Sequence, residues 1–232
     1  MGLQQRSATP RIYVQYNARS GKLVTTEKVD GQKVKTEHDS ISGVIQNLTI
    51  TEDEYEGQPR YDLNVHMTDG EARYQVTFNA DTRQALELMG RMNAADIGHP
   101  VLIGGYVLPA GEAGADGKPR DSDFVGVTLR QGEGFKTKID PFYSPELNNK
   151  QPKAVMLVDD NGNVVKVKGA EQIDKEATKL QRQQLIASLM GNVLGQVNAL
   201  KQGAKQGDEG VDAATAAAAA GDADRSAMRA RG

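Results

Sequence analysis

The sequence predicts a mainly β protein, and three observations carry this prediction. Four Asp-Gly or Asn-Gly pairs occur along the chain, and such pairs accept the positive φ angles that tight hairpins impose. Three of these pairs separate runs rich in Val, Thr, Tyr and Ile, which favour strands. In the runs that flank Asp69-Gly70, apolar residues alternate with polar ones, as in a strand with one buried face.

Between residues 41 and 130 the elements follow a definite order. Strands are expected at 41–51, 60–67, 72–78, 99–108 and 123–130, with an exposed Gly- and Ala-rich loop at 109–122. A helix is expected at 82–92, because Ala85, Leu88 and Met92 recur at helical spacing and Asp81 or Thr82 is a suitable N-cap. Gly43 suits a bulge or bend in its strand. Three strands, a helix and two strands are the order of an OB-fold, a five-stranded, partly open barrel.

The rest of the chain predicts additions to this barrel. Extra N-terminal strands are expected at 11–16, 22–28 and 33–36, extending the barrel or pairing with a neighbouring subunit, and 135–139 is a further candidate. The expected divisions are a disordered lead at 1–10, an OB-like barrel domain at 11–139, a connector at 140–152, a β-hairpin at 153–169, an amphipathic helix at 170–205 and a low-complexity tail at 206–232. We expect the long helix to support self-association or to dock on a protein partner.

Composition sets outer bounds on function. Hydrophobic residues make up 38% of the 232 residues, so part of the chain is expected outside any core. The net charge of −3 gives no overall attraction to nucleic acid, so such a role requires a local patch. The chain has no cysteine and no apolar run of the roughly 20 residues that a membrane span needs. We therefore expect a cytoplasmic protein with no disulfide and no membrane partner.

Signatures of catalysis are missing from the sequence. There is no phosphate-binding loop, nucleophile elbow or zinc-protease motif, so no enzyme activity, cofactor or metal site is predicted. The histidines, at 38, 66 and 99, are interpreted as polar surface or strand-end residues. The acidic cluster Glu52, Asp53, Glu54 and Glu56 has the oxygen ligands that a divalent cation prefers, but a solvated loop is the favoured interpretation.

Aromatic and basic residues are interleaved along the predicted strands. Binding of single strands without sequence preference needs rings on which bases stack, beside Lys or Arg that neutralise phosphates. Tyr13 alternates with Ile12 and Val14, so its ring is predicted to face outward, whereas Tyr61, Tyr74 and Phe78 are in phase with the core. The predicted nucleic-acid-binding residues are Arg11, Tyr13, Tyr16, Lys22, Arg60, Arg73, Lys118 and Arg120.

Residues 41 to 130 resemble the OB-fold single-stranded DNA-binding proteins of bacteria and bacteriophages. The resemblance is carried by the strand with Ile41-Ser42-Gly43, the hairpin around Asp69-Gly70, the 82–92 helix and the strand ending at Tyr106. It implies sequence-independent binding of single-stranded DNA in replication, recombination or repair, without a cofactor and commonly as an oligomer. Bacterial members commonly close an acidic tail with an apolar tip, whereas this chain ends Arg229-Ala230-Arg231-Gly232.

A second interpretation belongs to a different class. The acidic net charge, the extra N-terminal strands and the one-sided helix also fit a structural or assembly protein, such as a virion or scaffold component.

Overall fold

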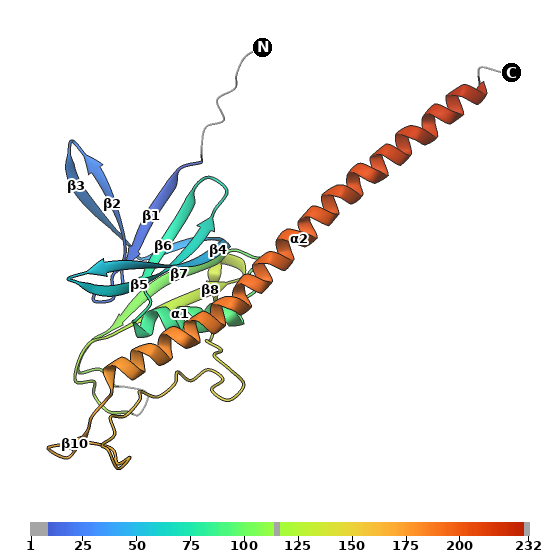
Figure 1. Cartoon of the computed structure of the whole chain (residues 1–232). Coiled ribbons are helices and arrows are strands. Elements are labelled where there is room, and N and C mark those ends of the chain that lie inside the picture. Colours follow the sequence, from blue (N-terminus) through green and yellow to red (C-terminus); the bar gives the residue numbers. More distant parts are fainter. Residues whose placement is uncertain (1–8, 114–116, 230–232) are drawn as a thin grey trace.

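The structure is a computed structural model that describes residues 9–113 and 117–229, and it is mainly β with a long C-terminal helix (Figure 1). Its elements are β1 (Arg11–Tyr16), β2 (Leu23–Val29), β3 (Gln32–His38), β4 (Ser40–Tyr55), β5 (Gln58–Thr68), β6 (Arg73–Asn79), α1 (Arg83–Ala94), β7 (Val101–Leu108), β8 (Phe124–Gln131), the short 3-10 helix η1 (Glu133–Phe135), β9 (Thr137–Lys138), β10 (Lys166–Val167), β11 (Ala170–Glu171) and α2 (Lys175–Arg229). The predicted strands and helices between residues 11 and 139 are thus present, close to their expected bounds.

Nine strands form one mixed sheet in the order β3-β2-β1-β6-β5-β4-β7-β8-β9. β1 and β6 are parallel, and the other neighbours are antiparallel. β4 bends between two partners, because its start pairs with β7 and the rest pairs with β5. The change of partner falls at Gly43, where a Cβ atom would lie 2.8 Å from the Thr68 carbonyl oxygen, so a side chain has no room there. The bulge in β4 lies further along the strand, between Ile45 and Asn47.

β1 occupies the edge of β6 that the last barrel strand, β8, would pair with in a closed barrel. In the described residues β6 pairs with β1 and not with β8, so the observed architecture is a large mixed sheet. Tyr16 on β1 lies at this seam: its ring stacks on Phe78 of β6 with centroids 4.7 Å apart, and its hydroxyl donates to the Gly126 carbonyl of β8 at 2.9 Å. β1 therefore contacts both strands that a barrel would bring together.

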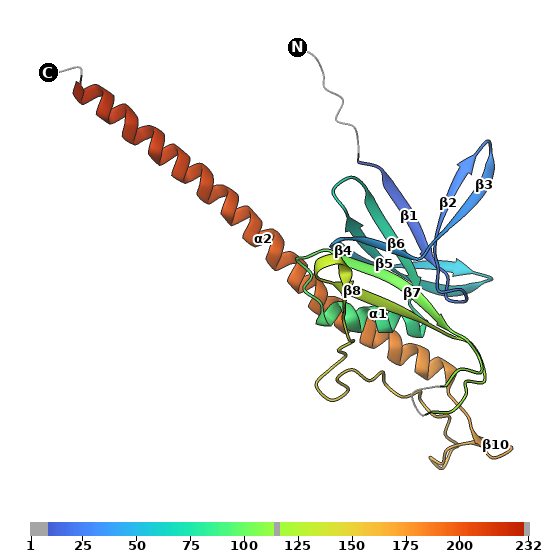
Figure 2. The same cartoon turned by 180° about the vertical axis from the view of Figure 1, so that it is seen from behind.

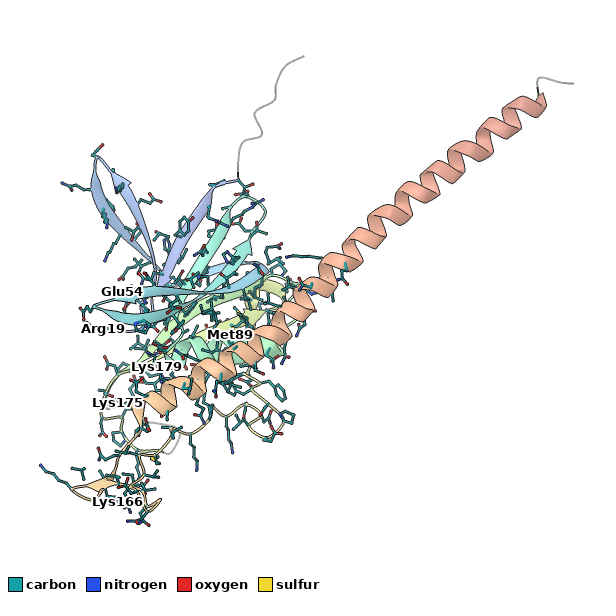
Figure 3. The ribbon with its side chains drawn as sticks, in the orientation of Figure 1. Arg19, Glu54, Met89, Lys166, Lys175 and Lys179 are labelled. Carbon is teal, nitrogen blue, oxygen red and sulfur yellow. The ribbon has the colours of Figure 1, made fainter. Side chains whose placement is uncertain are left out.

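α1 lies between the sheet and α2 (Figures 1 and 2), so most of its surface is buried, Met89 included (Figure 3). Thr82 is its N-cap, as predicted, with a side-chain oxygen that accepts from the Ala85 amide at 3.3 Å. α2 buries Ile186, Leu189 and Val193 in the same core. The first part of the long helix is therefore an integral layer of the domain.

α2 continues to Arg229, beyond the end expected at residue 205. Residues 206–229 of the expected low-complexity tail are thus helical, while 230–232 and the lead at 1–8 lie outside the described residues. The physical reason is the run of alanines at 216–220, because alanine has the highest helix propensity. Both views show this part of α2 extending away from the sheet (Figures 1 and 2).

The expected connector at 140–152 is docked on α1. The Phe142 amide donates to the Gly90 carbonyl at 2.9 Å, and the Tyr143 ring is buried against Gly90. The segment that follows forms the predicted small hairpin, with Val158 bridged to Val164, and β10 and β11 add a second turn. Within the described residues, no helix combines the length and the apolar character that crossing a membrane requires.

Candidate nucleic-acid interface

The outward face of β1 and β6 brings two of the predicted cations together. Side chains alternate along β1, so Ile12 and Val14 point inward while Arg11 and Tyr13 point outward. The parallel register pairs Arg11 with Arg73 of β6, and Tyr13 with Gln75. Neighbouring strands lie about 4.8 Å apart, so the two arginines are adjacent on one face.

A hollow of about 460 Å³ opens beside this arginine pair, and its lining includes Arg11, Arg73, Asn47 and His66. Among the residues that the structure describes, neither guanidinium has a carboxylate within ion-pairing distance. Like charges placed side by side in a sheet destabilise it. A bound anion would offset this repulsion, and the guanidinium fork matches phosphate oxygens.

His66 adds polarity but little charge to the hollow near neutral pH. Its Nε2 atom lies 3.0 Å from the Thr49 hydroxyl. Burial lowers the pKa of the imidazole, and repulsion from Arg11 lowers it further. The other two histidines also contact neighbours, His38 bonding to Thr25 and His99 to Asp96.

Tyr13 is the exposed aromatic residue of this face, as predicted. Its side chain is 61% exposed, and it lines a shallow hollow of about 230 Å³ together with Gln15, Val24, Thr26 and Thr77. An exposed ring two residues from Arg11 is the combination that stacks a base while the adjacent phosphate is neutralised.

Tyr16 is a correction to the predicted set. It is 7% exposed, and its ring and hydroxyl are both engaged at the seam between β6 and β8. The physical reason is the alternation of side chains along a strand. Tyr16 is an even number of residues from Ile12 and Val14, so it points to the same inward face of β1. Its ring is not available for stacking in this structure. Phe78 is in the core as expected, and Tyr61 and Tyr74 are partly buried against it.

Arg60 and Lys22 lie apart from the arginine pair and have acidic partners. Arg60 shares the outward face of β5, but its Nε atom donates to Asp62 at 2.8 Å. It lies eight residues from Thr68, the β5 partner of Arg73, which corresponds to roughly 26 Å along the strand. Lys22, in the turn before β2, forms an ion pair with Asp39, and this partner raises its pKa.

Lys118 and Arg120 belong to the loop between β7 and β8. Figures 1 and 2 place this loop at the end of the molecule opposite the start of β1. The Arg120 amide donates to the Glu112 carbonyl at 3.0 Å, and Ala113 bridges to Pro119, so these two sides of the loop pair with each other. The structure does not bring its cations to the arginine pair.

Three lysines were missed by sequence reasoning. Lys28, Lys33 and Lys35 lie on the hairpin of β2 and β3, where the register pairs Lys28 with Lys33 and Lys35 with Thr26. Thr26 lines the same hollow as Tyr13, so these lysines share the outward face of β1. The Asp30-Gly31 pair could have predicted this cluster. A two-residue turn at these positions fixes which residues of the two strands face each other, and so pairs Lys28 with Lys33.

The acidic residues around 52–56 form the tip of the β4–β5 hairpin, where Asp53 is the register partner of Arg60. Over the described part of the chain, no three acidic or histidine side chains gather closely enough to hold a metal ion.

Comparisons of this chain with protein-family models, with curated proteins and with solved structures give no match.

Proposed function

We propose that this protein binds single-stranded DNA without sequence preference, through the outward face of β1 and β6, in replication, recombination or repair. The observation that carries the proposal is the pairing of Arg11 with Arg73 in adjacent strands, with the exposed ring of Tyr13 on the same face. Two unpaired cations attract the DNA backbone, and an outward ring stacks a base of any identity.

The strand order supports an OB-fold assignment within this proposal. β4, β5, β6, α1, β7 and β8 follow the order of that fold, and β4 pairs with both β5 and β7, as the first strand of such a barrel does. β1 then fills the seam between the third and fifth barrel strands through Tyr16. In OB-folds, the surface of the second and third strands is the usual ligand face. Here that surface is formed by β5 and β6 and is extended by β1.

The polar groups beside Tyr13 favour binding without base readout. Gln75 donates to the Asn64 side-chain oxygen at 3.1 Å, and Thr77 donates to the same oxygen at 2.8 Å. Sequence readout requires side chains whose hydrogen-bonding groups reach base edges. Here the Gln75 amide and the Thr77 hydroxyl are engaged within the protein, which favours recognition by stacking and charge.

Titration of a fluorescently labelled oligonucleotide at several salt concentrations tests the proposal. The expected result is binding at micromolar protein or below, weakening steadily with salt, with similar affinity for unrelated sequences and weaker binding to duplex of equal length. Salt-insensitive binding, or none at micromolar protein, would overturn it.

A second candidate function is a structural or assembly protein that oligomerises through α2. The observation that favours it is the part of α2 that extends away from the sheet in both views (Figures 1 and 2). Light scattering without nucleic acid compares the full chain with a chain ending after Gly203, which keeps Ile186, Val193 and Val197 of the core. A large assembly formed by the full chain but not by the shortened chain supports this candidate. If both chains form the same oligomer, the part of α2 beyond Gly203 does not drive assembly.

A further inference from the structure

We propose that the β2–β3 hairpin is a second phosphate-binding element, which extends the path of a single-stranded DNA beyond Tyr13 by means of Lys28, Lys33 and Lys35. The inference rests on the proposed function, and it names a part of the interface that the β1–β6 face does not contain.

The three lysines share one face of the hairpin. Lys28 and Lys33 are register partners across the strands, and Lys35 is the partner of Thr26, two residues before Lys28. Side chains two residues apart in a strand point the same way, and register partners lie on the same side. The ammonium groups therefore form one cluster.

The charge of this face is predominantly positive. Glu37, the partner of Val24, has the same orientation and Asp30 lies in the turn between Lys28 and Lys33, whereas Glu27 lines the hollow on the opposite face. Within the described ranges, no carboxylate lies at ion-pairing distance from the three lysines. Their charges are thus free to neutralise phosphates.

The cluster continues directly from the ring of Tyr13. Tyr13 and Thr26 line one hollow, and Lys35 lies opposite Thr26. Lys28 is two residues further along β2, a step of about 7 Å, and because β2 runs antiparallel to β1 this step leads back toward the level of Arg11. A single-stranded DNA held by Arg11 and Arg73 and stacked on Tyr13 would therefore meet Lys35 beside the ring, with Lys28 and Lys33 on the side of Arg11.

The hairpin contributes little to the core. β2 pairs with β1 over Leu23–Thr25, and beyond that point the side chains of residues 26–37 are exposed. Figures 1 and 2 show the hairpin standing away from the rest of the sheet. An isolated two-stranded ribbon is only marginally stable, so burial does not explain why it projects. A role in binding DNA explains this projection.

The alternative explanation is that the lysines protect an edge. β3 is the first strand of the sheet order, and lysines on an edge strand discourage pairing with other chains. This explanation predicts that removing the lysines causes self-association while leaving the salt dependence of DNA binding unchanged, which separates it from the proposal.

The test measures the salt dependence of oligonucleotide binding for the full chain with Lys28→Gln, Lys33→Gln and Lys35→Gln together. The matched control carries Lys150→Gln, Lys153→Gln and Lys168→Gln, the same charge change outside the β1–β6 face. Each lost phosphate contact lowers the slope of log affinity against log salt by about 0.7, so the hairpin variant should lose about 2 and the control nothing. A variant with all three hairpin lysines changed to Arg should keep the original slope.

The outcomes are distinguishable. An equal slope in the hairpin variant and in the control, with the unmodified protein still binding, overturns this inference alone. Absence of binding by the unmodified protein overturns the proposed function and this inference with it. Circular dichroism establishes that each variant is folded, and light scattering that it has the same oligomeric state as the unmodified chain. If the Gln variant aggregates, the Arg variant decides the result.

Discussion

Arg11 of β1 and Arg73 of β6 are register partners in the one parallel strand pair of the nine-stranded sheet. Residues 62 positions apart in the sequence thus become neighbours with the same charge, on a face that also carries Tyr13. Nothing in the packing requires two cations at this point, because both side chains are exposed. A phosphate between them would convert the repulsion into two charge-assisted hydrogen bonds.

We expect Arg73→Gln to weaken binding of single-stranded DNA and Arg60→Gln to have little effect. Both arginines face outward on the same hairpin, but Arg60 is paired with Asp62 while Arg73 adjoins Arg11. The salt slope should fall by about 0.7 for Arg73→Gln. Anisotropy titrations at several salt concentrations measure it, and equal slopes for the two variants would remove the arginine pair from the interface.

Tyr13→Ala should reduce affinity, while Tyr13→Phe should preserve it. Stacking contributes about 1–3 kcal/mol per base, which corresponds to roughly 5- to 150-fold in the dissociation constant. Tyr16→Phe is the matched control: it removes the hydrogen bond to Gly126 and should cost about 1 kcal/mol of stability without changing DNA affinity. If Tyr16→Phe weakened binding more than Tyr13→Ala did, the outward face would be wrongly assigned.

The alternation of residues in the sequence was sufficient to orient Tyr13 and Arg73, because a strand with one buried face fixes the direction of every side chain. The same rule places Tyr16 inward. Its prediction as a binding residue was wrong because its position among basic residues was given more weight than its phase.

Long-range pairing could not be derived from the sequence. The parallel pairing of β1 with β6 brings Arg11 to Arg73, and it depends on contacts between segments about 60 residues apart that leave no local pattern. The helix beyond residue 205 was missed for a different reason. The composition after residue 205 is typical of a low-complexity tail, although its alanines favour a helix.

Acidification should destabilise the protein through His66. The folded state lowers the pKa of His66, by burial and by repulsion from Arg11, below the usual value near 6.5. The unfolded state therefore binds more protons, so the stabilising contribution is complete above about pH 6.5 and is lost as the pH falls toward the lowered pKa.

Melting temperatures at pH 7.5 and pH 5 measure this effect. The unmodified protein should lose more stability on acidification than His66→Gln, because His38 and His99 are present in both proteins. An identical loss in the two proteins would contradict the account of His66.

Gly90→Ala should destabilise the domain, although the same change usually stabilises a helix by about 1 kcal/mol. A Cβ atom at this position would lie 2.6 Å from the Cε1 atom of Tyr143, whose ring is 4% exposed. In a Tyr143→Ala background the clash is removed, so Gly90→Ala should become neutral or stabilising. Urea unfolding of the four proteins gives this double-mutant cycle. A destabilising effect of equal size in both backgrounds would show that Tyr143 is not the cause.

Photocrosslinking of the full chain to a single-stranded oligonucleotide that contains a photoreactive thymine analogue, followed by mass spectrometry, determines which face of the protein the DNA contacts. We expect the crosslinked peptide to carry Tyr13, and we expect Arg11→Gln together with Arg73→Gln to reduce its yield greatly. Crosslinks confined to α2 or to the β7–β8 loop, unaffected by the two substitutions, would contradict this expectation.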